Sequence, residues 1–261
     1  MEPVKAKFPA ISYADLWILA SYAAIEHMGG PVIPFTGGRT DAADESACPP
    51  EHMLPDGFHH PVQTPGPDDY DHPGPGTAAY VRWVFNKMGF NDREMVCLIG
   101  AHALGRCHTN ASGYDGPWTR APETFSNEYF RLMLEDTWTV RNWSGERERL
   151  PTRAGPRFSH TTVLAGPLQY ENSKSGSDLM MLPADIVLVE DAKFRAICEE
   201  YAADYDLFAK EFAVNFKKLT ELGFTEFGLA WYETTAGMVG LTAAAAAGLY
   251  AASQQVKEKP S

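Results

Sequence analysis

Residues 91–118, NDREMVCLIGAHALGRCHTNASGYDGPW, combine a helix start, a histidine and a glycine-rich turn. Asn91, followed three residues later by Glu94, is the pattern of an N-terminal capping box and predicts a helix across 91–108. One face of that helix carries small and apolar side chains, namely Val96, Ile99, Gly100 and Ala103. His102 lies on or beside this face. A single histidine there is usually a core residue, so other parts of the chain must show whether it binds a metal.

Composition excludes some classes of function. The chain has 261 residues, with 22 Lys and Arg against 34 Asp and Glu, a formal net charge of −12. This charge argues against binding to nucleic acid and is compatible with a basic protein partner. The four cysteines form no C-x-x-C pair, which favours a reducing compartment, and the N-terminal residues do not resemble a signal peptide.

The remaining sequence predicts a mainly α fold without internal repeats. Apolar residues recur at helical spacing in four further segments, at 11–30, 77–90, 124–138 and 180–224. Residues 141–179 look irregular, with some short-strand potential.

A segment rich in proline, residues 48–76, predicts a long surface loop. It also holds Cys48 and four histidines: His52, His59, His60 and His72. Four histidines and a cysteine are compatible with a zinc site, but no close ligand spacing supports one.

The C-terminal segment differs from the rest. Residues 234–253 carry no charge, and as a helix they span roughly 30 Å, the thickness of a bilayer's hydrocarbon core. Aromatic residues precede the segment and lysines follow it. Small residues at Gly240, Ala244 and Gly248 favour close packing against another helix. We expect a helical domain over 1–230 and a transmembrane helix with a short tail over 231–261. An alanine-rich helix packed on a soluble partner is the alternative.

Six further motifs point to one family: KFPAISYADLWILA, GGPVIPFTGGRTD, SGYDGPW, FSNEYF, MMLPADIVLVED and the helical run that follows to residue 224. With NDREMVCLIGAHALGRCH, their order resembles the class I haem peroxidases, which include cytochrome c peroxidases and ascorbate peroxidases. The resemblance covers most of residues 7–224. It implies a helical peroxidase fold and haem b as cofactor.

The resemblance also implies roles for individual residues. His102 matches the proximal histidine that coordinates the haem iron, and Asp185 matches the buried carboxylate that accepts its other ring N–H. Trp118 matches the aromatic residue beside the proximal ring. His108 matches a position near a haem propionate, although an ordinary polar residue at a helix end is the alternative.

Other positions depart from the family pattern. Family members carry Arg-x-x-Trp-His or Arg-x-x-Phe-His on a distal helix upstream of KFPAIS, whereas only six residues precede Lys7 and no such motif occurs in this sequence. His52 and Met53 replace a Gly-Arg pair in a propionate-side loop, and Ala111 stands where ascorbate peroxidases have an arginine. The sequence therefore predicts an N-terminally shortened peroxidase fold without the distal catalytic residues.

These departures and the C-terminal helix predict a catalytically impaired accessory subunit of a membrane complex. The resemblance and the C-terminal helix together predict an organelle membrane, that of the mitochondrion. Gly240, Ala244 and Gly248 would pack against the other subunits, and a basic redox protein is a further candidate partner. Two alternatives stay open. One is an active haem peroxidase that reduces hydrogen peroxide with a distal half supplied elsewhere, and the other is a haem electron-transfer or sensor protein. Haem retention also stays open.

Overall fold

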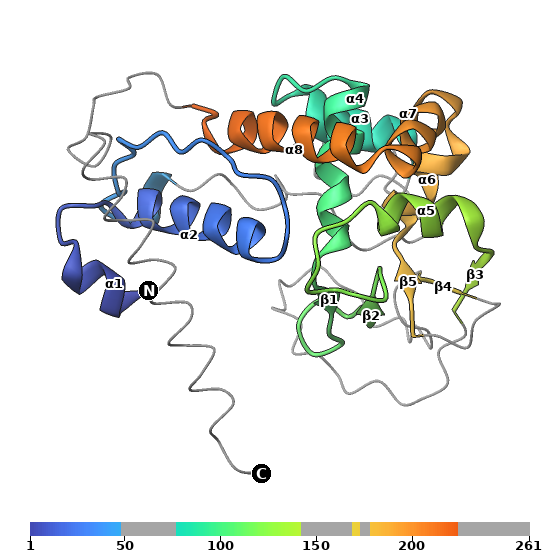
Figure 1. Cartoon of the computed structure of the whole chain (residues 1–261), viewed down its shortest axis with the longest axis horizontal. Helices are drawn as coiled ribbons and strands as arrows, with labels where there is room; N and C mark the ends of the chain where they lie inside the picture. The colour runs from blue at the N-terminus through green and yellow to red at the C-terminus, as the bar shows by residue number, and fades with distance from the viewer. Residues whose placement is uncertain (48–76, 142–168, 173–177, 224–261) are drawn as a thin grey trace, which may run out of the picture. The chain divides into compact units, whose positions relative to one another are not determined.

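The computed structural model describes residues 1–47, 77–141, 169–172 and 178–223. The chain divides into two compact units, one formed by Met1–Pro49 with Phe212–Ser261 and the other by Pro50–Glu211. Helices predominate in the described part of each unit (Figure 1), so the predicted mainly helical fold is confirmed.

The first unit contains α1 (Glu2–Lys7), α2 (Tyr13–His27), the 3-10 turn η1 (Glu45–Ala47) and the end of α8 (Tyr205–Thr220). The Ser12 hydroxyl begins α2 by accepting a hydrogen bond from the Asp15 amide. The buried Asp15 carboxylate in turn accepts from the Arg39 guanidinium at 2.9 Å and the Gly38 amide at 2.7 Å. These bonds hold the loop after α2 against the start of the helix.

The second unit holds most of the helices: α3 (Ala78–Asn86), α4 (Asp92–Ile99), α5 (Glu128–Glu135), α6 (Pro183–Glu190), α7 (Ala192–Ala203) and the start of α8. Aromatic rings form much of its core. The ring of Phe130 lies 5.3 Å from that of Tyr201 and 5.1 Å from that of Phe208, centroid to centroid. All three side chains are fully or almost fully buried.

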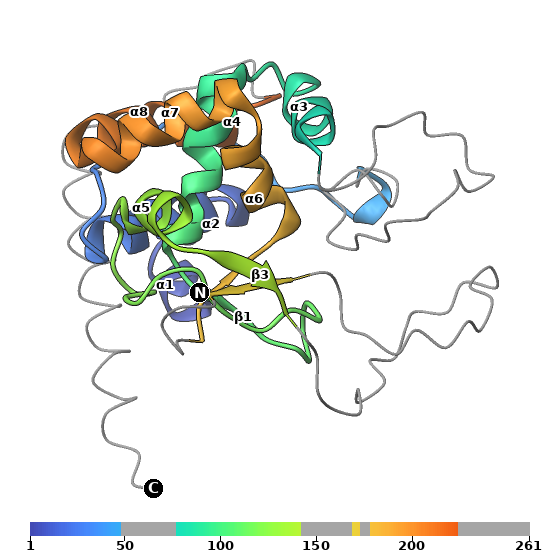
Figure 2. The same cartoon turned by 90° about the vertical axis from the view of Figure 1, so that its right-hand side faces the viewer.

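Two small antiparallel sheets belong to the same unit. One pairs β1 (Arg106–Cys107) with β2 (Gly116–Pro117), and the other has the order β3 (Trp138–Val140), β4 (Tyr170–Asn172), β5 (Met180–Met181). Within the second sheet, Glu171 lies opposite both Thr139 and Met180. Within this unit the strands lie on one side and α3, α4 and α7 on the other, as Figures 1 and 2 show.

The predicted helix across 91–108 is shorter than expected. The capping box at Asn91 is present, but α4 ends at Ile99 and continues only as the 3-10 turn η2 (Gly100–Ala103). Leu104 then takes an extended backbone and Gly105 a φ of 81°, which most other residues disfavour. His102 therefore lies on a short turn directly after α4.

The predicted helical segment 180–224 is divided into a short strand and three helices. Asp191 begins α7, because its carboxylate accepts hydrogen bonds from the amides of Lys193 and Phe194. Asp204 similarly accepts from the Leu207 amide at the start of α8. Helical periodicity continues across these caps, and for that reason the apolar pattern did not reveal the breaks.

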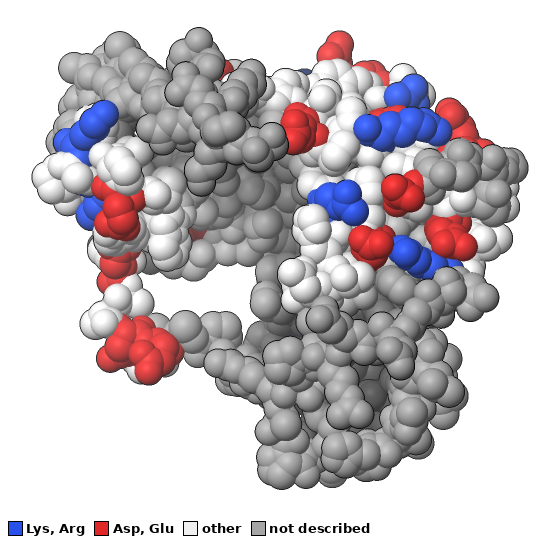
Figure 3. All heavy atoms as spheres, turned by 90° about the horizontal axis from the view of Figure 1, so that it is seen from below, with Lys and Arg blue, Asp and Glu red and all other residues white. Residues whose placement is uncertain are grey.

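In the right-hand part of Figure 3, charged side chains of both signs are interspersed. In the second unit, Arg82 lies 2.8 Å from Asp92 and 2.8 Å from Asp191. This network ties the end of α6 to α3 and the start of α4.

Within the described ranges, none of the helices combines the length and apolar character needed to cross a bilayer. The expected helix after residue 231, with Gly240, Ala244 and Gly248, lies outside the described residues. The same holds for the proline-rich loop 48–76, including its histidines and Met53.

Candidate functional site

A buried carboxylate at the start of α6 is the centre of the candidate site. Pro183 occupies the first turn of the helix, where an amide hydrogen is not needed. Asp185 follows two residues later, and its Oδ2 accepts a hydrogen bond from the Leu182 amide at 2.6 Å. The positive end of the helix dipole further stabilises the negative charge. Contacts at the start of its own helix therefore hold the Asp185 side chain in place without help from other elements.

Three side chains from other elements donate to the same carboxylate. His102 Nδ1 and the Tyr129 hydroxyl bind Oδ1 at 2.8 and 2.6 Å. Trp118 Nε1 binds Oδ2 at 2.8 Å. With the Leu182 amide, each oxygen receives two hydrogen bonds, which fills the four acceptor positions of a carboxylate.

The Asp185 side chain is completely buried, and burial alone raises the pKa of a carboxyl. The positive charge of His102 in its protonated form opposes this effect, as do the hydrogen bonds from His102, Tyr129 and the Leu182 amide. Together they hold the pKa of Asp185 below its ordinary value. Asp185 is accordingly ionised and accepts only, so the proton it shares with His102 belongs to Nδ1.

Two aromatic rings fix the orientation of His102. Trp118 stacks on the imidazole with 4.3 Å between centroids and 14° between planes. Tyr129 meets the imidazole edge-on, at 5.9 Å and 84°. The ring is thus held by a hydrogen bond at one nitrogen and by contacts on two sides.

The second ring nitrogen of His102, Nε2, indicates a function for this residue. The His102 side chain is 32% exposed, and among the described residues only Asp185 hydrogen-bonds to it. Nε2 is therefore the nitrogen that remains for a ligand. A neutral imidazole with Nδ1–H bound to a carboxylate is the usual form of a metal-binding histidine.

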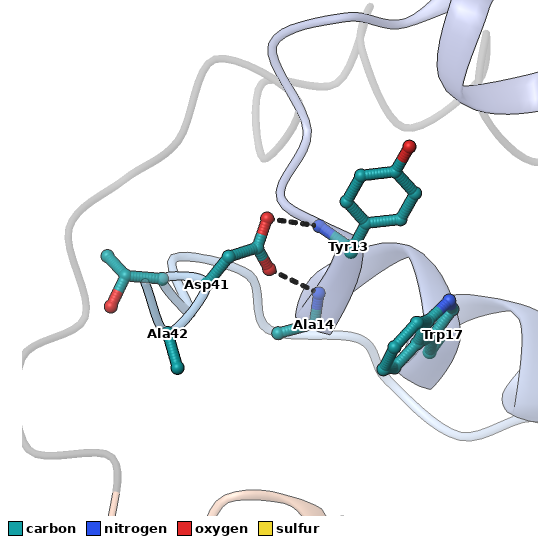
Figure 4. Close-up of a pocket in the computed structure, with 6 residues that line it drawn as sticks. Tyr13, Ala14, Trp17, Asp41 and Ala42 are labelled. Atoms are coloured by element: carbon teal, nitrogen blue, oxygen red, sulfur yellow. Dashed lines mark hydrogen bonds between the residues drawn. The ribbon is translucent and has the colours of Figure 1, made fainter. Parts of the chain in front are cut away.

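A hollow of about 450 Å³ in the first unit is a weaker candidate (Figure 4). It is lined by Tyr13, Ala14, Trp17, Thr40, Asp41 and Ala42. The Asp41 carboxylate accepts hydrogen bonds from the amides of Tyr13 and Ala14 at 2.9 and 2.8 Å. Because this carboxylate is already used at the start of α2, the hollow has a structural explanation. Within residues 1–47, 77–141, 169–172 and 178–223, no three His, Cys, Asp or Glu side chains gather as a metal-ion site.

Comparison with known proteins identifies the family. The model of the family described as Peroxidase matches residues 1–204. The chain belongs to the peroxidase family. The predicted kinship with class I haem peroxidases is confirmed by relatives named mitochondrial cytochrome c peroxidase. Family membership implies haem b as the cofactor.

The relatives share much of this chain. The mitochondrial cytochrome c peroxidase of Pyricularia oryzae is 45% identical over 223 residues, which cover 85% of this chain and 51% of the relative. That of Emericella nidulans is 44% identical, with the same coverage. A protein of Mycosarcoma maydis, provisionally named heme-binding peroxidase, is 43% identical over 85% of this chain and 58% of its own length. The chain thus spans about half the length of the curated relatives it matches.

The structure of this peroxidase-family chain brings three of the four predicted site residues together, namely His102, Trp118 and Asp185. His108 is different: it lies in an exposed turn, where its carbonyl oxygen accepts from the amides of Ala111 and Ser112. Among the described residues, its side chain takes no part in the hydrogen bonds around Asp185. Its predicted role near a propionate stays a prediction.

Sequence reasoning missed Tyr129. The residue lies in the motif FSNEYF, and its position on the apolar face of α5 indicates simple packing. Burial raises its pKa well above the ordinary value, and the nearby Asp185 charge raises it further. A tyrosine on the apolar face of a helix is buried together with its hydroxyl, and a buried hydroxyl needs a hydrogen-bond partner. That need was the signal in the sequence that could have identified Tyr129.

Proposed function

We propose that this chain provides the proximal half of a haem peroxidase site and that the assembled site reduces hydrogen peroxide. The observation that carries the proposal is the Asp185 carboxylate, which holds His102 through Nδ1 and Trp118 through Nε1. The relatives' names support peroxidase activity, whereas neither the described fold nor the relatives add support for the predicted accessory subunit or for a membrane location.

The residues present fit a haem group. Histidine is the usual axial ligand of haem in peroxidases, and His102 keeps Nε2 outside the hydrogen bonds of the described residues. Its ring cannot turn easily, because Trp118 stacks on it and Asp185 fixes Nδ1. When bound, haem supplies the iron at which peroxide is reduced and oxidising equivalents are stored.

Asp185 determines how strongly His102 donates to a metal. A buried carboxylate that accepts the Nδ1 proton shifts negative charge onto the imidazole. A more basic imidazole stabilises the oxidised iron, which lowers the reduction potential. Trp118 supports the same geometry, since its N–H holds the second carboxylate oxygen and its ring packs beside the imidazole.

Reduction of hydrogen peroxide would also need groups that His102 and its neighbours do not supply. A base must move a proton between the two peroxide oxygens, and a cation must stabilise the leaving oxygen. These 261 residues contain no Arg-x-x-Trp-His or Arg-x-x-Phe-His segment. We therefore assign these two roles to a polypeptide segment outside these 261 residues.

We propose a basic redox protein as the electron donor and the mitochondrion as the location. The net charge of −12 supports a basic partner, because opposite charges accelerate encounter. Relatives named mitochondrial cytochrome c peroxidase support both parts of this proposal.

The experiment begins with haem binding by the full chain. The purified protein should take up one haem per chain, with a spectrum that His102→Gly abolishes and added imidazole restores. His27→Gly is the matched control, because it removes an exposed imidazole at the end of α2, outside the cluster, and should leave the spectrum unchanged. Retention of the unaltered spectrum by His102→Gly without imidazole would refute the assignment of the ligand.

A further inference from the structure

We propose that Tyr129 is a positioning residue that weakens the pull of Asp185 on the His102 proton and thereby raises the reduction potential of iron bound at Nε2. This inference rests on the proposed function. It concerns the phenol hydroxyl alone, since a phenylalanine would supply the same ring.

The hydroxyl and the imidazole share one oxygen of the carboxylate. Tyr129 donates to Asp185 Oδ1 at 2.6 Å, and His102 Nδ1 donates to the same atom at 2.8 Å. Trp118 and the Leu182 amide bind the other oxygen. Of the donors to Asp185, Tyr129 is therefore the one that competes directly with His102.

Competition at one atom has a predictable direction. Each donor draws electron density from the oxygen it binds, so a second strong hydrogen bond makes Oδ1 a poorer acceptor for the first. The Nδ1 proton then stays closer to His102. The imidazole carries less negative charge, and oxidised iron is stabilised less.

The burial of Tyr129 keeps its hydroxyl hydrogen-bonded to Asp185. Tyr129 is fully buried, and its hydroxyl lies 2.6 Å from Asp185 Oδ1. Among the described residues, Asp185 is its only hydrogen-bond acceptor. Turning the hydroxyl away would leave a buried polar group unsatisfied, which costs about 1–3 kcal/mol.

The first test is Tyr129→Phe in the haem-loaded full chain. Without the competing hydroxyl, the His102–Asp185 hydrogen bond should strengthen. The ferric/ferrous reduction potential should shift to more negative values, and the iron–histidine stretching frequency in the resonance Raman spectrum should rise. A change confined to packing would not be expected to shift both readouts in these directions.

Tyr201→Phe is the matched control. It also removes a buried tyrosine hydroxyl from the same core, but that hydroxyl donates to Glu211 and not to Asp185. It should leave the potential and the stretching frequency unchanged. Tyr129→Phe added to Asp185→Asn should likewise have little further effect. The asparagine side chain lacks the carboxylate charge that pulls on the His102 proton.

A second substitution keeps the test informative if the Tyr129→Phe variant does not fold. Replacing Tyr129 with 3-fluorotyrosine keeps the hydroxyl and makes it a stronger donor, so the potential should shift upward. An iron–histidine band that His102→Gly removes, but that neither Tyr129 substitution moves, would overturn this inference and leave the proposed function intact. Absence of that band in the unaltered protein would overturn both.

Discussion

Trp118 and His102 lie 4.3 Å apart, ring centroid to ring centroid, and one carboxylate binds a nitrogen of each. The two rings are thus parallel because Asp185 presents one oxygen to the imidazole and the other to the indole. Orientation and charge at the site both depend on this single side chain.

Asp185→Asn should raise the reduction potential of bound haem. A neutral amide pulls less strongly on the His102 proton, so oxidised iron loses stabilisation. Haem should still bind, because His102 remains. Spectroelectrochemistry would measure the shift, with Asp115→Asn as a control at a partly exposed carboxylate. An unchanged potential would show that Asp185 does not act on the iron through His102.

Trp118→Phe should destabilise the protein while leaving His102 bonded to Asp185. The variant loses the N–H that binds Oδ2, and a buried hydrogen bond to a charged group contributes about 1.5–3 kcal/mol. Urea unfolding should report a lower free energy of unfolding by at least this amount, since the smaller ring also packs less well. Trp17→Phe, at a side chain 61% exposed, should change it by only about 0.5 kcal/mol.

Gly100→Ala should destabilise the turn that carries His102. A Cβ there would lie 2.7 Å from a ring carbon of Phe208 and 2.8 Å from one of Phe130. Overpacking of this kind costs about 1–3 kcal/mol. Phe208→Leu should remove more stability from the unaltered protein than from the Gly100→Ala variant. Thermal unfolding of the four proteins would measure this coupling, and additive effects would contradict the steric explanation.

Asp191→Asn should lower stability at neutral pH but not in strong acid. Hydrogen bonds from Arg82 lower the pKa of Asp191 from an ordinary 3.8 to about 2. A lowered pKa in the folded state gives stability that is fully present above the ordinary pKa and is lost as the pH falls toward the folded one. The difference in unfolding free energy between the two proteins should therefore be constant above about pH 5 and shrink from pH 4 to 2. Asparagine also caps helices, so this comparison isolates the charge. A difference independent of pH would exclude the ion pair as its source.

The sequence predicted much of the site, because each of His102, Trp118 and Asp185 lies in its own recognisable motif. It did not predict Tyr129, because a tyrosine on an apolar helix face has the same pattern as a packing residue. Nor did it show the breaks at Asp191 and Asp204, where helical periodicity runs on through each cap. Only the three-dimensional arrangement shows which donors share an oxygen of the carboxylate.

The positions in the sequence of the residues that donate to Asp185 also determine when these hydrogen bonds can form during synthesis. His102 precedes Asp185 by 83 residues, Trp118 by 67 and Tyr129 by 56. A ribosome releases the chain from its N-terminus, so all three donors emerge well before their common acceptor. Until α6 has left the exit tunnel, the imidazole has no carboxylate to hold its ring. A nascent chain shorter than this point therefore lacks the hydrogen bond that fixes the His102 ring.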